Sequence, residues 1–385
     1  MKKARILLIG TRTHHARYLS LYRKSIELSG REAEFWISGP WNSLFKSQKS
    51  LVSRVTGAKW IPFLLARVLP WDLTLYSIHC FSRFLLPTKK MYLGHGIDTG
   101  EDSIKGGCHT YGALRRRGGK PFYDLMTPKS RAEFDRAIRY QPRLEGRLAL
   151  IGDPLLDHVI ETDRSRQRHR AELGIAPGKV VVGLFSSWGP SSRLSSWVES
   201  LLLHKDSLPS DLVFMFFVHP NNMLLRSRAT DFERTKSLVR DLGWILVPPD
   251  EDFAKYMSCC DCGITADGSI GIYFSHLGRP LFYNGMFDGK TIMDNPFSRL
   301  AAWTPRIEDV PSFCANRLKS EMGKYPFEKL SALALSCVNR VGMGHQDIGV
   351  VINTALNTPS GKEWTEVPWE RLAETRGNGA TGRPG

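Results

Sequence analysis

Arg5-Ile-Leu-Leu-Ile-Gly10, near the start of the chain, is an unbroken apolar run that ends in glycine. Such a run is typical of a parallel β-strand buried on both faces, and the glycine favours a turn into a helix. Residues 11–30 fit that helix, and residues 33–38, 73–78 and 90–93 fit further strands with helical material between them. This alternation predicts a doubly wound α/β domain built on a parallel sheet.

The first domain is expected to continue to about residue 160. Residues 124–128 and 148–151 are predicted as strands, with a helix over 130–140 between them. The stretch Gly152-Asp-Pro-Leu-Leu-Asp157 closes this part of the chain. An arginine-rich segment at 162–170 follows, which we interpret as the connection between two domains and the helix after it.

The strand pattern then starts again with Val180-Val-Val-Gly-Leu-Phe185. Further strands are predicted at 212–218, 244–247, 262–265 and 280–283, and a length of 385 residues suits two ordinary domains. We therefore predict two Rossmann-like domains, at residues 1–160 and 161–345. Residues 346–385 are expected to add a C-terminal helix and a disordered, glycine-rich tail.

Two kinds of chemistry are not indicated. No Gly-x-Gly-x-x-Gly pattern follows the first strand, so there is no dinucleotide fingerprint. Cys259-Cys260-Asp261-Cys262 lacks the second Cys or His pair of a zinc site, so we predict small buried side chains there and no metal. The chain has seven cysteines, and their use as small buried residues implies a reducing, cytoplasmic setting.

The chain is strongly basic, with 53 Lys and Arg against 38 Asp and Glu and a formal net charge of +15. This excess favours anionic partners, among them phosphate-rich molecules and an anionic membrane face. Arg115-Arg116-Arg117 is either a solvated loop or a phosphate or headgroup contact. No nucleic-acid-binding motif accompanies the charge, so no nucleic acid is expected. No signal peptide or membrane-spanning run is seen, so any membrane contact is expected from the surface.

Four polar loops follow predicted strands: Gly94-His95-Gly96, Ser186-Ser187-Trp188, His219-Pro220 and Asp267-Gly268-Ser269. Ligands of open parallel sheets bind beyond the carboxyl ends of the strands. The first loop belongs to one predicted domain and the other three to the second. If the two domains face each other, the four loops converge on one central cleft.

His95 is the strongest candidate for acid–base chemistry. Its flanking residues, Gly94 and Gly96, allow the backbone to approach a ligand closely, and histidine exchanges protons near neutral pH. A base that deprotonates an acceptor hydroxyl would suit this position. The alternative is a histidine that stabilises a turn.

His219 and the loop 267–269 are candidates for holding phosphate. His219 is either a donor near a phosphate or a partly buried residue at the edge of the core. Residues 270–278 fit a helix, so Asp267, Gly268 and Ser269 would place backbone N–H groups and a hydroxyl beside an anion. An ordinary helix N-cap is the alternative. Ser186 and Ser187 are predicted as further donor-binding residues.

The sequence resembles the family of CDP-glycerol glycerophosphotransferases, which includes teichoic-acid and capsule polymerases with a GT-B fold. Five markers carry the resemblance in order over roughly residues 70–290: Tyr92-Leu-Gly-His-Gly-Ile97, Gly152-Asp-Pro-Leu-Leu-Asp157, Leu184-Phe-Ser-Ser-Trp188, Val218-His219-Pro220 and Thr265-Ala-Asp-Gly-Ser269. Asp98 and Thr99 stand where the family usually has proline and lysine.

The resemblance implies a GT-B transferase of cell-envelope synthesis. It would move a glycerol phosphate, or a related polyol phosphate or sugar, from a CDP- or UDP-activated donor to a hydroxyl of a membrane-linked polymer. No cofactor or metal is expected, because a basic protein can neutralise phosphate itself. The protein would work in the cytoplasm, peripherally at the inner face of the membrane. Two alternatives stay open: a nucleotide-sugar glycosyltransferase or UDP-sugar 2-epimerase of the same fold, and a non-catalytic binder of polyanions.

Overall fold

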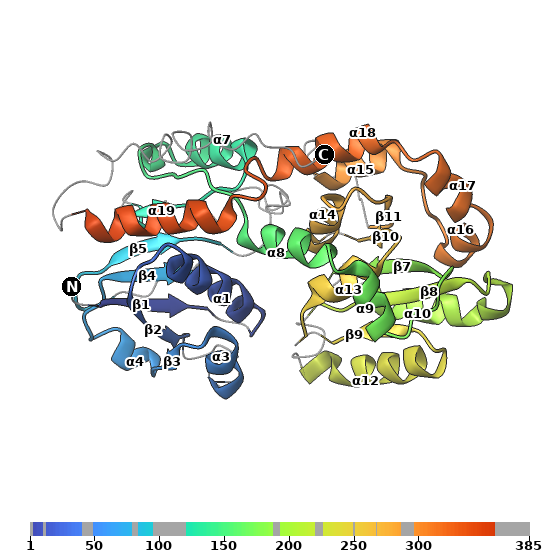
Figure 1. Ribbon diagram of the computed structural model, residues 1–385, viewed down its shortest axis with the longest axis horizontal. Coiled ribbons are helices and arrows are strands. Elements are labelled where there is room, and N and C mark those ends of the chain that lie inside the picture. Colours follow the sequence, from blue (N-terminus) through green and yellow to red (C-terminus); the bar gives the residue numbers. More distant parts are fainter. Residues whose placement is uncertain are drawn as a thin grey trace. The chain divides into compact units, whose positions relative to one another are not determined.

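The computed structural model describes residues 3–10, 13–40, 49–78, 84–94, 121–187, 193–219, 226–248, 251–266, 268–285 and 296–358. These residues form two units, each built around one parallel sheet (Figure 1). Residues 3–94, 121–157 and 338–358 make up the first unit, and residues 158–337 make up the second.

The first sheet has six parallel strands in the order β3-β2-β1-β4-β5-β6. Its strands are β1 (Ala4–Ile9), β2 (Ala33–Ser38), β3 (Lys59–Trp60), β4 (Leu73–Tyr76), β5 (Lys89–Tyr92) and β6 (Leu125–Met126). The sequence predicted all of them except β3. This strand is two residues long and begins with an exposed lysine, so it has too little apolar pattern to stand out.

Alternate residues of β1 pack into two different cores, which explains its continuous apolar run. Ile6 and Leu8 belong to a core completed by α1 (Thr13–Leu28) and by α19 (Gly344–Asn357). Leu7 and Ile9 face a second core completed by α4 (Phe63–Ala66) and α7 (Arg131–Tyr140). A strand covered on both faces needs apolar residues at every position. A further helix, α3 (Lys49–Thr56), packs against α1.

The predicted strand at 148–151 is wrong. Leu148 makes a single bridge to Met126, and no regular strand follows it. Pro128 lies opposite this segment and accepts a hydrogen bond from the N–H of Ile151. Because proline has no N–H to donate, a regular ladder cannot continue past it.

The second sheet has five parallel strands in the order β11-β10-β7-β8-β9. The predicted strands are confirmed here as β7 (Val180–Phe185), β8 (Leu212–Phe217), β9 (Ile245–Val247), β10 (Cys262–Thr265) and β11 (Leu281–Tyr283). Cys259, Cys260 and Cys262 are fully buried, as predicted. The helices of this unit are α10 (Leu194–Leu203), α12 (Arg226–Asp241), α13 (Phe253–Cys259), α14 (Ser269–Ser275), α15 (Pro296–Trp303), α16 (Val310–Asn316), α17 (Leu318–Gly323) and α18 (Phe327–Cys337).

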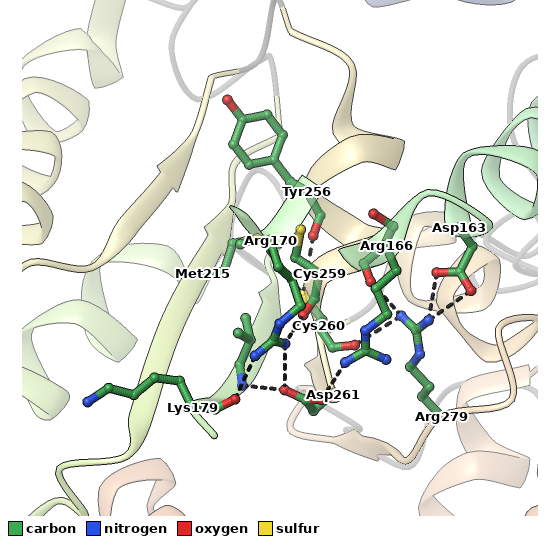
Figure 2. A network of polar contacts seen from close by, with 12 residues as sticks. Asp163, Arg166, Arg170, Lys179, Met215, Tyr256, Cys259, Cys260, Asp261 and Arg279 are labelled. Carbon is green, nitrogen blue, oxygen red and sulfur yellow. Dashed lines mark hydrogen bonds and ion pairs between the residues drawn. The ribbon is translucent and has the colours of Figure 1, made fainter. Parts of the chain in front are cut away.

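The arginine-rich segment after residue 157 is packed against the second sheet. It consists of the second half of α8 (Pro154–Asp163) and of α9 (Arg166–Glu172). Arg166 and Arg170 both pair with Asp261, which precedes β10 (Figure 2). The second carboxylate oxygen of Asp261 also accepts the backbone N–H of Val181 at 2.7 Å. Arg170 donates to the carbonyl of Lys179 at 2.7 Å. One carboxylate thus joins α9 to the amino ends of β7 and β10.

A third arginine, Arg279, completes this network. Arg279 binds both oxygens of Asp163, at 2.6 and 2.8 Å, and donates to the carbonyls of Ser258 and Cys260 (Figure 2). All of these contacts lie at the amino edge of the second sheet. Its carboxyl edge, where the predicted polar loops emerge, takes no part in them.

The C-terminal helix α19 belongs to the first unit. From the sequence we predicted residues 346–385 as a C-terminal helix and tail outside both domains. Gly152 donates its N–H to Asp347 at 2.9 Å, and Arg340 binds the same carboxylate at 2.7 and 2.8 Å. A Cβ atom on Gly152 would lie 2.3 Å from the carbonyl oxygen of Arg340, so only glycine allows this approach. The predicted disordered tail lies outside the described residues.

None of the described helices is long and apolar enough to cross a membrane.

Replacing Asp261 with alanine should destabilise the second unit by about 2–3 kcal/mol, because two arginines and a backbone N–H lose their acceptor. Urea unfolding measures the effect. Glu161→Ala is the control, because Glu161 pairs with Arg164 on the surface, where both side chains are at least 67% exposed. That variant should change stability by less than about 1 kcal/mol. Equal effects of the two substitutions would show that the network is not structural.

Candidate active site

Three of the four predicted loops lie side by side at the carboxyl edge of the second sheet. Thr265, Phe185 and Phe217 end three adjacent strands and stand in register with one another. The segments that follow them carry Gly268-Ser269, Ser186-Ser187 and His219, respectively. Trp188, Pro220 and Asp267 lie outside the described residues.

The order of the strands singles out one point on this edge. From β7 the chain proceeds to β8 and β9 on one side, whereas β10 and β11 lie on the other side. The connections leaving β7 and β10 therefore diverge, and a divergence of this kind is where open α/β sheets form a ligand-binding crevice. Ser186 and Ser187 follow β7, and Gly268 and Ser269 follow β10. His219 stands one strand away and is partly buried.

The start of α14 offers backbone donors at this crevice. Gly268 is the N-cap in an extended conformation, and it has no side chain to accept from the first turn. The first N–H groups of a helix have no partner within the helix. A Cβ atom on Gly271 would lie 2.3 Å from the hydroxyl oxygen of Thr265, so α14 packs directly on the end of β10. This close contact fixes the position of the first turn over the crevice.

Ser186 shapes the loop after β7. Its hydroxyl oxygen accepts the N–H of Arg193 at 3.1 Å, and its own N–H donates to the carbonyl of Phe217 at 3.3 Å. Ser186 and Ser187 are both buried. The Ser186 hydroxyl thus closes the turn between β7 and α10, a structural task that the sequence did not reveal.

In the first unit, Gly94 ends the connection from β5 with a φ of +73°, a conformation that favours glycine. The hydroxyl of Tyr22, on α1, donates to the carbonyl of Gly94 at 2.7 Å. Burial raises the pKa of Tyr22 well above its usual value, so this hydroxyl keeps its proton as a donor. The residue before His95 is therefore held by a buried tyrosine. His95 and Gly96 lie outside the described residues, as do residues 115–117.

The Gly152-to-Asp157 stretch forms the junction with α19. The carboxylate of Asp157 accepts the N–H groups of Gly342 at 2.9 Å and His345 at 3.3 Å. Burial raises the pKa of Asp157 to about 6 despite these bonds. Beside it, Asp153 forms a buried ion pair with Lys129 at 2.8 Å. Sequence reasoning missed Lys129, although it follows β6 at a strand end, as the other candidates do.

No group of three His, Cys, Asp or Glu side chains among the described residues is arranged to hold a metal ion.

Comparison with known proteins establishes the fold. The chain matches no protein-family model. It is 27% identical to the lipid-A-disaccharide synthase of Syntrophotalea carbinolica over 133 residues, 34% of this chain and 32% of that enzyme. The chain thus matches about a third of the length of this curated relative.

Three solved structures resemble the chain over most of its length. The wall teichoic acid polymerase TagF has a TM-score of 0.59 at 15% identity and covers 92% of this chain and 89% of its own. A protein assigned as a UDP-N-acetylglucosamine 2-epimerase, from Listeria monocytogenes, has a TM-score of 0.60 at 12% identity and covers 94% and 99%. HepE from Anabaena, in complex with UDP-glucose, has a TM-score of 0.53 at 13% identity and covers 91% and 99%. The chain therefore has a GT-B-like fold, as predicted.

Asp157→Asn should change how stability depends on pH. Because the pKa of Asp157 is raised on folding, the native state binds more protons than the unfolded state, and stability falls as pH rises from about 4 to about 6. The wild type should lose up to about 3 kcal/mol relative to Asp157→Asn over this range, with no further difference above it. Urea unfolding at several pH values measures this. If the free energy of unfolding of the two proteins depended on pH in the same way, the raised pKa of Asp157 would be contradicted.

Proposed function

We propose that this protein is a transferase that takes its donor as a nucleoside diphosphate derivative, bound at the carboxyl edge of the second sheet. The observation that carries the proposal is the placement of Ser186-Ser187, His219 and Gly268-Ser269 on three adjacent strand ends. The crevice between β7 and β10 lies among them. The first N–H groups of α14 have no partner within the helix, and such groups suit the anionic diphosphate of this donor.

The fold neighbours support this class of donor. The 2-epimerase is named for a UDP-sugar, HepE was solved with UDP-glucose, and TagF polymerises wall teichoic acid. All three resemble this chain in fold over more than 90% of its length. We take from them the class of donor, a cytidine or uridine diphosphate derivative, and we take the transferred group from the markers shared with glycerophosphotransferases.

In the proposed reaction the acceptor hydroxyl attacks the phosphorus that carries glycerol. A new O–P bond forms, the bond to the nucleotide breaks, and the electron pair leaves with the phosphate oxygen of CMP. His95 takes the proton of the acceptor hydroxyl. His219, Ser269 and the N–H groups of Gly268 and Ile270 hold the diphosphate and stabilise the charge that grows on the leaving group. Asp267 belongs to the proposed diphosphate-binding loop, and Gly94 and Gly96 flank His95 in the sequence.

A glycosyltransferase or 2-epimerase acting on a UDP-sugar is the second candidate, favoured by two of the three fold neighbours. It would use the same diphosphate site but a different transferred group. A non-catalytic polyanion binder would require neither donor. Binding of CDP-glycerol without binding of UDP-glucose favours the glycerophosphotransferase, and the reverse result favours the second candidate.

The donor should raise the unfolding temperature of the protein, because a ligand at 100 times its Kd adds about 2.7 kcal/mol of stability. His219→Ala should shrink this shift. His95→Ala should retain it but slow turnover by roughly 10²- to 10⁴-fold. His204→Ala is the control, since this exposed residue caps α10. Full turnover by His95→Ala would remove His95 from the mechanism, and the absence of any donor-induced shift would sink the proposal.

The membrane contact of the proposed transferase has a candidate surface in the first unit. Five large apolar side chains are exposed there, Leu64 (60%), Leu65 (53%), Val68 (43%), Leu85 (71%) and Leu86 (41%), which we call the leucine patch. Its two segments are adjacent, because the N–H of Leu85 donates to the carbonyl of Arg67 at 2.8 Å. Exposed apolar clusters of this kind mark interaction surfaces.

The basic composition of the surrounding sequence favours an anionic lipid surface as the partner of the leucine patch. Between residues 49 and 94 the sole acidic residue is Asp72. The same stretch contains seven basic residues: Lys49, Arg54, Lys59, Arg67, Arg83, Lys89 and Lys90. Each basic residue near an anionic membrane contributes about 1 kcal/mol, and leucine side chains enter the interface.

The full chain should float with vesicles that contain phosphatidylglycerol and not with pure phosphatidylcholine vesicles. The double variant Leu64→Glu/Leu85→Glu should lose at least tenfold in binding, while Leu203→Glu, at a leucine 81% exposed on α10, should bind as the wild type does. Salt should weaken the interaction. Self-association that the double variant abolishes, without vesicle binding, would show that the patch meets protein instead.

A further inference from the structure

A cavity of about 760 Å³ opens at the carboxyl end of β11, entirely within the second unit. Its walls come from the start of α10, from the residues after β11 and from the segment 301–310. Its size falls in the range of small-molecule sites, about 300–1,000 Å³. None of the residues assigned above to donor binding lines it, so its ligand has to be inferred from other residues. We call it the β11 pocket.

The base of the β11 pocket is held rigidly by one amide. Asn284 accepts the indole N–H of Trp197 at 2.8 Å and donates its own amide to the carbonyl of Ile307 at 2.7 Å. Its backbone N–H donates to the carbonyl of Thr265, the last residue of β10, at 2.9 Å. Asn284 thereby ties all three walls together and connects them to the strand that precedes α14. The pocket is preformed, which lowers the entropic cost of binding.

Arg193 places a positive charge on the wall, which also carries the carboxylates of Glu308, paired with Arg306 at 3.8 Å, and of Asp309. Its Nε atom is buried and has no hydrogen-bond partner among the described residues. A buried donor without an acceptor is costly, and for a charged guanidinium the missing acceptor is most simply an anion. The backbone N–H of Arg193 is fixed by Ser186, so the side chain starts from a defined position.

Three hydroxyl groups on the walls of the pocket, those of Ser196, Ser200 and Thr304, all donate to acceptors of the protein. Ser196 donates to the carbonyl of Arg193 at 3.0 Å, and Thr304 donates to that of Leu300 at 2.8 Å. Ser200 donates to Asp309 at 3.3 Å. Each of these hydroxyl groups therefore uses its O–H in a hydrogen bond to the protein, and only its lone pairs are left to accept from a ligand. A complementary ligand brings several O–H donors of its own.

We propose that the β11 pocket binds a polyol phosphate or sugar phosphate, with the phosphate at Arg193 and the hydroxyl groups at Ser196, Ser200 and Thr304. Because β11 pairs with β10, the pocket lies on the same edge as the proposed diphosphate site, one strand spacing of about 4.8 Å further along. Under the proposed function, this ligand is either the group being transferred or the end of the acceptor.

Titration of the full chain with glycerol 3-phosphate tests the pocket directly, with glycerol and inorganic phosphate as separate probes. Glycerol 3-phosphate should bind more tightly than either part. Arg193→Gln should weaken it at least tenfold. Ser196→Glu, which adds a negative charge at an exposed position of the wall, should do the same without disturbing the core. Arg240→Gln is the matched control, since the Arg240 side chain is 78% exposed on α12 and does not line the pocket.

Two further measurements identify the source of the phosphate. If the pocket holds the transferred group, Arg193→Gln weakens CDP-glycerol binding about as much as glycerol 3-phosphate binding. If it holds the acceptor, CDP-glycerol binding is unchanged and the KM for the acceptor rises. No binding of glycerol 3-phosphate by the wild type, or binding by both pocket variants as tight as that of the wild type, would overturn the proposal. Glycerol 3-phosphate binding without any nucleotide binding would overturn the proposed function but leave the pocket intact.

Discussion

The parallel pairing of β7 with β8 on one side and β10 on the other is the constraint on which the second unit depends. It requires the three strands to end at one edge, so the polar segments after Phe185, Phe217 and Thr265 emerge together. It also requires the connections from β7 and β10 to leave in opposite directions. The crevice that we assign to the donor is a consequence of this divergence.

The same pairing explains why the charges are divided between the two edges. At the amino edge, Asp261 and Asp163 are saturated by Arg166, Arg170 and Arg279. These ion pairs are intramolecular and stabilise the sheet. At the carboxyl edge, the first turn of α14 and the Nε of Arg193 have donors to offer. The charges at the amino edge are thus paired with one another, whereas the carboxyl edge has hydrogen-bond donors that suit an anion.

Much of the architecture could be predicted because parallel strands covered on both faces are continuous apolar runs, as in β1 and β7. Contacts between distant residues could not. Arg166 resembled a linker residue because its partner, Asp261, is 95 positions away. The role of Gly152 depends on Arg340 and Asp347, and the role of Tyr22 depends on Gly94. The candidate loops were found by their place after strands, whereas the β11 pocket needed the packing of Asn284 and Trp197.

The most direct test of the account is hydrogen–deuterium exchange of the full chain with and without CDP-glycerol or UDP-glucose. The account predicts that a bound donor slows exchange at the amides of residues 268–271, 186–187 and 219, where the three strand ends meet. Donor binding that protects other parts of the chain and leaves these amides unchanged would contradict it.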